Sequence, residues 1–285
     1  MLAFFQPYLN KVKMMPVIHS SDGTRIVFDQ SGSGPALILV GGMFEYRAFN
    51  SETAQLAQSP LLNENFTVFH YDRRGRGESG NTLPFALERE IEDIETLIDH
   101  AGGEAFLFGM SSGAALAFEA ALMLGHPKVK KLALYEPPYN DADDARQTWQ
   151  GFHQALQILL ADDRKSEAVA LFMSLLGVPD DHIEDMQADP SWPQMESVAA
   201  TIAYDVAALG KDASVPADRA TQLQIPSLLL LGEESPYPFM QLTADRLAKS
   251  IPNARVHQLA GQSHEVQAEA LVPFLIDFFK PSASD

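Results

Sequence analysis

The sequence predicts an α/β fold in which a mostly parallel β-sheet is covered by helices on both faces. Three observations support this prediction. Short apolar runs alternate with amphipathic helical patterns over most of the 285 residues. Several of these runs contain no polar residue, which is typical of strands that are buried on both faces. Finally, residues 137–222 show helical patterns only, which indicates a helical lid inserted between two strands.

The predicted strands are separated by turns or by helices. Residues 17–18 and 26–28 flank the turn Ser21-Asp22-Gly23, so the chain is expected to begin with a hairpin. The later strand candidates are residues 36–40, 66–70, 105–108, 132–135, 227–231 and 255–259. Apolar residues at helical spacing predict a helix marked by Leu87, Ile91, Ile94 and Ile98, and a final helix over residues 268–278.

The alternation of strands and helices stops between residues 137 and 222. Helical spacing there predicts three helices, over residues 149–160, 171–175 and 202–209. Because parallel strands deliver active-site loops at their carboxyl ends, an insertion at this point is expected to form a lid. We therefore expect a core of residues 16–136 and 223–285, a lid of residues 137–222, and an N-terminal extension of residues 1–15.

Composition argues against several classes of protein. The 38 acidic residues outnumber the 20 basic ones, and the formal charge of −18 argues against partners such as nucleic acid or anionic membranes. No apolar run approaches the length of a membrane span. Lys11 and Lys13 come late in the N-terminal extension, whereas a secretory signal begins with its positive charges. The chain has no cysteine, which excludes thiolate chemistry and fits the expected cytoplasmic location.

A Gly-x-Ser-x-Gly sequence is the most informative motif. Gly109-Met110-Ser111-Ser112-Gly113 stands between the apolar run 105–108 and an alanine-rich helical pattern at 114–121. A sharp turn from strand to helix would hold Ser111 in a strained backbone conformation, which requires neighbours that are nearly free of side chains. It would also place the hydroxyl at a helix N-terminus, where N–H groups favour developing negative charge. Ser111 is therefore the candidate nucleophile.

A serine hydroxyl needs a base to become a good nucleophile. His264 is the candidate base, because residues 261–265 form a polar turn between the last strand and the last helix. The oxyanion hole requires two backbone N–H groups. We expect one from Ser112 and the other from Met43, which follows the two glycines after the strand at 36–40.

The neighbours of these groups and the lid are expected to bind the substrate. The residues expected to line its pocket are Phe44, Met110, Phe152 and Trp192. No histidine pair has the spacing of metal ligands on one predicted helix. The sequence therefore predicts neither a metal nor a cofactor.

Together these motifs resemble the α/β-hydrolase fold superfamily, over nearly the whole chain from Val17 to Phe279. The resemblance rests on Gly109 to Gly113, on the loop at Gly41-Gly42, and on the late Gly261-x-x-His264. Residues 72–79, Asp-Arg-Arg-Gly-Arg-Gly-Glu-Ser, are similar to the tight turn that this family places after its fourth strand. The resemblance implies an eight-stranded sheet, a helical cap and a Ser-His-acid triad.

The triad acid departs from the family pattern. Many relatives carry it after the seventh strand as Gly-x-x-Asp, whereas Gly232-Glu233-Glu234-Ser235 ends in serine here. Three alternatives follow. The acid is Glu136, at the end of the strand at 132–135, which resembles the acid position of some haloalkane dehalogenases; or it is Glu234, one residue early; or it is absent, and Ser235 only hydrogen-bonds the imidazole.

The sequence therefore predicts a serine hydrolase that cleaves an ester, thioester or related acyl bond of a small apolar substrate through an acyl-enzyme. Ser111 excludes the carboxylate nucleophile that dehalogenases and epoxide hydrolases of the superfamily need. Carbon–carbon bond hydrolases and cofactor-free haloperoxidase-like enzymes share the same constellation. A non-catalytic ligand receptor that keeps the pocket is the alternative from another class, and Ser235 motivates it.

Overall fold

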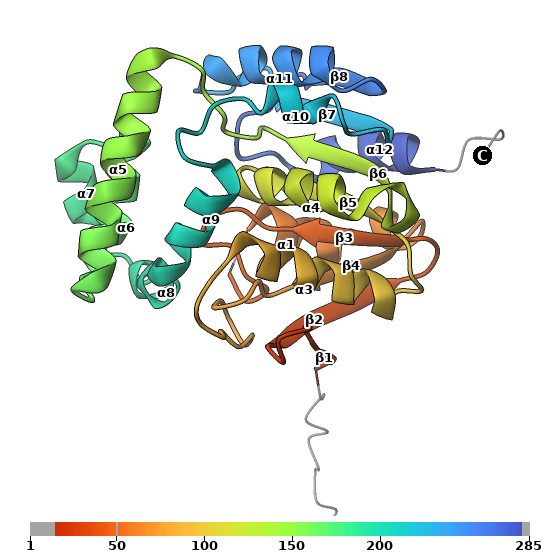
Figure 1. Cartoon of the computed structure of the whole chain (residues 1–285), viewed down its shortest axis with the longest axis horizontal. Helices are drawn as coiled ribbons and strands as arrows, with labels where there is room; N and C mark the ends of the chain where they lie inside the picture. Colours follow the sequence, from red (N-terminus) through yellow and green to blue (C-terminus); the bar gives the residue numbers. More distant parts are fainter. Residues whose placement is uncertain (1–14, 50, 281–285) are drawn as a thin grey trace, which may run out of the picture.

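The computed structural model describes residues 15–49 and 51–280, and in this part of the chain eight strands form one sheet (Figure 1). Their order is β1-β2-β4-β3-β5-β6-β7-β8. Strands β1 and β2 pair antiparallel, β2 pairs antiparallel with β4, and all later pairs are parallel. The predicted fold class is thus confirmed. The strands are β1 (Val17–His19), β2 (Arg25–Gly32), β3 (Ala36–Val40), β4 (Thr67–Tyr71), β5 (Ala105–Met110), β6 (Val129–Tyr135), β7 (Ser227–Gly232) and β8 (Ala254–Leu259).

Alternate residues of the strands pack into two separate cores. In β3, Ile38 and Val40 belong to the core that contains helices α3 (Leu87–His100), α4 (Ser112–Lys128) and α11 (Phe239–Ser250). Leu37 and Leu39 belong to the opposite core, with α1 (Glu52–Gln58), α2 (Pro60–Asn63) and α12 (Ala268–Phe279). All four side chains are fully buried, and each such burial stabilises the fold by about 1.5–3 kcal/mol. The strand period of two therefore produces the three-layer fold.

Between β6 and β7 the chain forms helices only. We call residues 137–222 the cap segment. Figure 1 shows α5 to α8 on one side of the sheet, and α9 lies against α4. The helices are α5 (Asp143–Ala161), α6 (Lys165–Leu175), α7 (Asp180–Gln187), α8 (Trp192–Ser197), the 3₁₀ helix η1 (Ala199–Thr201), α9 (Ile202–Leu209) and α10 (Ala217–Ala220).

The three predicted helices of this segment correspond to α5, to the second half of α6 and to α9. Helices α7, α8 and α10 were not predicted. They have eight, six and four residues, too few to show an apolar stripe over several turns. Of the eight residues of α7, only Ile183 is buried, so the apolar signal there is especially weak.

The strand order brings four loops to one edge of the sheet. Strands β3, β5, β6 and β7 are parallel neighbours, so the residues that follow them, Gly41, Ser111, Glu136 and Glu233, meet at their carboxyl ends. No helix among the described residues has both the length and the apolar character needed to cross a membrane. The predicted N-terminal extension lies, apart from Met15, outside the described residues.

Candidate active site

Ser111 lies at the turn between β5 and α4, and its backbone has φ 53° and ψ −128°. Positive φ is strained for a residue with a side chain. Both flanking glycines are required, because a Cβ on Gly109 would lie 2.6 Å from the carbonyl oxygen of Gly113. A Cβ on Gly113 would lie 2.4 Å from the carbonyl oxygens of Val40 and Gly41. The turn therefore packs closely against the loop that follows β3.

The hydroxyl of Ser111 and the carboxylate of Glu136 lie on opposite sides of the His264 ring. Oγ of Ser111 is 3.2 Å from Nε2, and Oε2 of Glu136 is 2.6 Å from Nδ1. Because a carboxylate oxygen only accepts hydrogen bonds, Nδ1 carries the proton and Nε2 can accept from the serine hydroxyl. This is the geometry in which an imidazole can take the proton of an attacking serine.

Glu136 follows β6 with a positive φ of 44°, and its side chain is buried. Besides the contact with His264, its carboxylate accepts the backbone N–H of Gly232 at 2.9 Å and the hydroxyl of Ser235 at 3.1 Å. A buried carboxylate needs such partners, because an unpaired buried charge is costly. Three donors thus hold the carboxylate of Glu136 beside Nδ1 of the His264 ring.

These contacts separate the three alternatives for the acid. The structure brings Glu136 to the imidazole of His264. The Ser235 hydroxyl contacts Glu136 instead of the ring. The side chain of Glu234 is exposed to solvent, while its backbone N–H donates to the carbonyl of Gln262 at 2.8 Å.

The loop that carries His264 is held on the ends of β6 and β7. The hydroxyl of Tyr135 donates to the carbonyl oxygen of Ser263 at 2.5 Å. Gly232 permits the close approach of the loop, because a Cβ there would lie 2.3 Å from the carbonyl oxygen of Gln262. The ring of Tyr237 meets the His264 ring edge-on, with 5.6 Å between the centroids. The imidazole is therefore positioned by the Tyr135 hydroxyl, by the close backbone approach at Gly232 and by the ring of Tyr237.

The loop after β3 lies against the nucleophile turn. A Cβ on Gly42 would lie 3.2 Å from the Cβ of Ser111. Ser112 is the first residue of α4, so its N–H has no partner within the helix. Within the described part of the chain, neither this N–H nor that of Met43 donates to a protein acceptor. The two N–H groups that the sequence predicts as oxyanion donors are thus not occupied by protein acceptors among the described residues.

An aromatic series connects this loop with the cap segment. The rings of Phe44 and Phe172 meet edge-on with 5.5 Å between centroids. Phe172 lies 6.3 Å from Phe152, which lies 5.5 Å from Trp149. Two of the four residues expected to line the pocket, Phe44 and Phe152, therefore belong to one apolar cluster.

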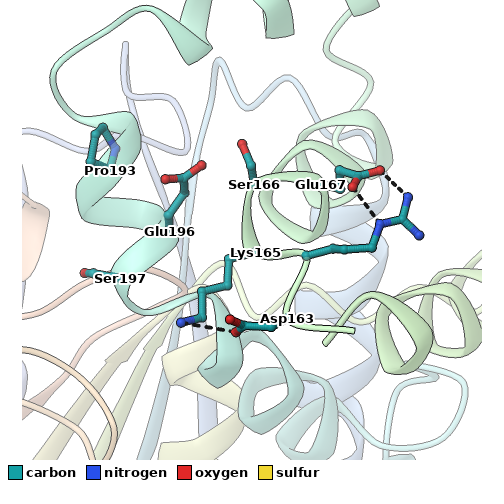
Figure 2. A pocket seen from close by; sticks show the side chains of 8 residues that line it. Asp163, Lys165, Ser166, Glu167, Pro193, Glu196 and Ser197 are labelled. Carbon is teal, nitrogen blue, oxygen red and sulfur yellow. Dashed lines mark hydrogen bonds and ion pairs between the residues drawn. The ribbon is translucent and has the colours of Figure 1, made fainter. Parts of the chain in front are cut away.

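The other two expected pocket residues have different partners. Met110 is buried in the core that contains α12. The indole N–H of Trp192 donates to Ser166 at 2.8 Å and to Glu196 at 3.0 Å. Both partners line a surface pocket of about 460 Å³ in the cap segment, where acidic and basic side chains pair with one another (Figure 2). Contacts within the protein thus account for the burial of both residues.

Residues 72–79, which the sequence predicts only as a structural turn, also contact the site through two arginines. Nη1 of Arg73 donates to the carbonyl oxygen of Gly41 at 3.1 Å, and Nη1 of Arg76 donates to that of Gly42. Both guanidinium groups also bind Asp205 of α9. Among residues 15–49 and 51–280, no three His, Asp or Glu side chains are arranged to hold a metal ion.

Comparison with known protein families shows to which family the chain belongs. The model of the family described as "Alpha/beta hydrolase family" matches residues 36–274, which is most of the chain. The protein therefore belongs to this family, whose members are hydrolases.

The names of the proteins that are similar to this chain refer to different activities. A protein named "Putative non-heme chloroperoxidase" from Synechocystis sp. is 23% identical over 90% of this chain and 95% of its own length. The crystal structure of an alpha/beta hydrolase from Sphaerobacter thermophilus is 46% identical, with a TM-score of 0.81 over 93% of this chain and all of that one. A thermophilic esterase from Thermogutta terrifontis shares the fold at 23% identity, with a TM-score of 0.65 over 93% of this chain and 99% of its own.

Proposed function

We propose that the protein is a serine hydrolase that cleaves an ester, thioester or related acyl bond of a small apolar substrate. The observation that carries the proposal is the line of contacts from Ser111 through His264 to Glu136, at 3.2 and 2.6 Å. The strained backbone of Ser111 supports the same role, because it exposes the hydroxyl at the start of α4. Membership of a hydrolase family agrees with this chemistry.

In the first half of the reaction, Oγ of Ser111 attacks the carbonyl carbon while Nε2 of His264 takes the hydroxyl proton. The carbonyl oxygen becomes an oxyanion, which the N–H groups of Met43 and Ser112 bind. Glu136 stabilises the imidazolium that forms and keeps its orientation. When the tetrahedral intermediate collapses, the bond to the leaving alcohol or thiol breaks, and the leaving group receives the proton from His264.

In the second half, water hydrolyses the acyl-enzyme. His264 takes a proton from the water as its oxygen attacks the acyl carbon, and the same two N–H groups bind the second oxyanion. Collapse of this intermediate releases the carboxylic acid and returns the proton to Ser111. Because acylation releases the alcohol before the acid forms, a burst of alcohol is expected whenever deacylation is the slower step.

The apolar surroundings of the site support a small apolar substrate. Phe44, next to the proposed donor Met43, packs against Phe172 of the cap segment. Phe152 of α5 lies next to Phe172 and belongs to the same apolar cluster. The cap segment, residues 137–222, is proposed as a lid domain that covers the acyl group and excludes water from the oxyanion hole.

The proposal is tested with a fluorophosphonate probe and a panel of p-nitrophenyl esters, thioesters and lactones. Stoichiometric labelling that Ser111→Ala abolishes, together with turnover of at least one class that the same variant abolishes, is the expected result. Labelling of another residue, or turnover that Ser111→Ala leaves intact, would refute the serine mechanism. A wild-type protein that neither labels nor turns over would favour the non-catalytic receptor.

A second candidate activity is favoured by the Synechocystis relative, whose printed name is that of a chloroperoxidase. A cofactor-free halogenation would use the same serine and imidazole. The discriminating assay follows bromination of monochlorodimedone with hydrogen peroxide, bromide and acetate, in the wild type and in Ser111→Ala. Halogenation that exceeds ester turnover and depends on Ser111 would establish this activity as the principal one.

A further inference from the structure

Three arginines follow β4, and all are buried. A buried guanidinium is costly unless its donors find partners. Arg74 binds carboxylates of the core, Asp93 on α3 and Asp22 in the turn after β1. Arg73 and Arg76 differ from Arg74, because each also donates to a backbone carbonyl of the loop that follows β3.

We propose that Arg76, held by Asp205 of helix α9, is a positioning residue that aims the N–H of Met43 into the oxyanion hole. The inference rests on the proposed function, to which it adds a residue that acts without touching the substrate. The contact between Arg76 and Asp205 also connects the cap segment with the N–H donor of Met43, because Asp205 belongs to that segment.

The contact between Arg76 and Gly42 determines the direction of the next N–H group. Besides Nη1 of Arg76, the carbonyl oxygen of Gly42 accepts the backbone N–H of Glu45 at 3.3 Å. The peptide bond between Gly42 and Met43 is trans, so its N–H points opposite to its carbonyl. With the carbonyl turned to the arginine, the N–H of Met43 faces away from it and, among the described residues, meets no protein acceptor.

The preceding peptide group is held at both ends. Its carbonyl oxygen, on Gly41, accepts Nη1 of Arg73 at 3.1 Å. Its N–H, on Gly42, donates to Oε2 of Glu45 at 3.1 Å. Only the backbone torsions of Gly42 then separate this fixed group from the donor peptide, and glycine is the residue with the most torsional freedom. The contact with Arg76 restricts that freedom, together with the longer contact from the N–H of Glu45.

Asp205 keeps the two arginines together. Its Oδ1 lies 2.6 Å from Nη1 of Arg73, and its Oδ2 lies 2.5 Å from Nη2 of Arg76. Burial acts to raise the pKa of Asp205, but the charges of the two arginines hold that pKa below its ordinary value. The carboxylate is therefore ionised at neutral pH. Without it, two buried cations would face each other and Arg76 would lose its anchor.

The experiment compares Arg76→Lys with the matched variant Arg74→Lys. Both remove a buried guanidinium that binds a carboxylate, and both retain the positive charge. A lysine cannot bind the carboxylate and the carbonyl in the same fixed geometry. Unfolding temperature, kcat and KM with p-nitrophenyl acetate, and inhibition by benzeneboronic acid are measured for both. The boronate adduct on Ser111 is tetrahedral and needs the oxyanion donors, whereas ground-state binding does not.

We expect Arg76→Lys to lower kcat by about 10- to 100-fold, with KM within about threefold of wild type. The effect should be smaller than the complete loss of one oxyanion donor, which lowers kcat by about 10²- to 10³-fold. The inhibition constant of the boronate should rise by a similar factor. Arg74→Lys should lower the unfolding temperature but leave kcat and the inhibition constant within about twofold. If both variants lose kcat equally, or if Arg76→Lys keeps wild-type kcat, the inference is wrong.

A milder variant covers the case in which Arg76→Lys does not fold. Nε of Arg76 donates to Oγ1 of Thr201 at 3.0 Å, and Thr201→Val removes this contact at nearly constant volume. A fall in kcat of about three- to tenfold with unchanged KM is expected, and unchanged kcat would overturn the inference. Failure of the proposed function is distinct, because then the fluorophosphonate does not label Ser111 in the wild-type protein.

Discussion

The hydroxyl of Ser235 donates to the carboxylate of Glu136 at 3.1 Å, on the same oxygen that contacts the imidazole of His264. The two residues follow neighbouring parallel strands, since Tyr135 of β6 pairs with Leu230 of β7. The ends of both strands therefore meet at one carboxylate oxygen of Glu136, which in turn contacts Nδ1 of His264. A carboxylate after β6 and a hydroxyl after β7 satisfy together the position that a single aspartate after β7 fills in many relatives.

The first prediction concerns Glu136→Gln, which should lower kcat for ester hydrolysis by a factor on the order of 10⁴. An amide can donate to Nδ1, which favours the tautomer with its proton on Nε2. That tautomer cannot accept the proton of Ser111. The measurement is kcat with p-nitrophenyl acetate, with the unfolding temperature as a check on folding.

Glu234→Gln is the control for this variant. The side chain of Glu234 is exposed, so its replacement should leave kcat within about twofold of wild type. If instead Glu234→Gln abolished turnover and Glu136→Gln did not, Glu234 would be the triad acid.

The second prediction is that the acid can be moved from β6 to β7. Ser235→Asp alone should lower kcat, because it sets a second carboxylate beside the buried Glu136, and like charges disfavour ionisation of the pair. In the double variant Glu136→Ser with Ser235→Asp, the new carboxylate takes over the imidazole. We expect kcat about tenfold or more above that of Glu136→Ser alone, since one charge-assisted hydrogen bond is restored. Equal kcat values for these two variants would contradict the prediction.

Signals that are local in the sequence predicted the sheet and two members of the candidate triad. Each predicted strand overlaps an observed one. The signal is strongest for β5 and β7, which are buried along their whole length and therefore need a continuous apolar run. Ser111 is identified by the glycines that its own turn requires, and His264 by the polar turn between the last strand and helix. These signals come from residues that are close together in the sequence, so they can be recognised before the structure is known.

Other features depend on contacts between distant residues. The choice among Glu136, Glu234 and Ser235 depends on the register of β6 and β7 and on the positive φ of Glu136. Arg76 is 34 residues from Gly42 and 129 residues from Asp205, and a buried arginine has no local signature. The contact of Trp192 with Ser166 likewise exists only once α6 and α8 have packed together.

The third prediction concerns Glu45, a buried acid in the loop that follows β3. Burial raises the pKa of Glu45 from 4.5 to about 8, and the negative charge of Glu52 adds to the effect. The folded protein therefore keeps a proton that the unfolded chain loses above about pH 4.5. The stability that Glu45 contributes is fully present below that pH and is lost as pH rises through about 8. Between these values the free energy of unfolding should fall by about 1.4 kcal/mol per pH unit from this group alone.

Urea denaturation of the wild type and Glu45→Gln at pH 5, 6, 7 and 8 measures this contribution. Glutamine can accept from Gly42 and Thr53 as the protonated acid does, but it does not titrate. The wild type should therefore lose stability relative to the variant as pH rises. Glu52→Gln should shift the loss to lower pH. Parallel curves for the wild type and Glu45→Gln would show that Glu45 does not hold a proton in the folded state.

The last prediction tests the close packing of the nucleophile turn with two glycine-to-alanine variants. A Cβ on Gly113 would lie 2.4 Å from two carbonyl oxygens of the β3 end, so Gly113→Ala must displace backbone. We expect it to cost about 1–3 kcal/mol in unfolding free energy and to lower kcat more than tenfold, because the displaced loop carries the Met43 donor. Gly151→Ala in α5 meets nothing within 4 Å and should stabilise the helix by up to about 1 kcal/mol with kcat unchanged. Thermal unfolding and ester kinetics of both variants measure these effects, and an active, stable Gly113→Ala would mean that the turn does not depend on this contact.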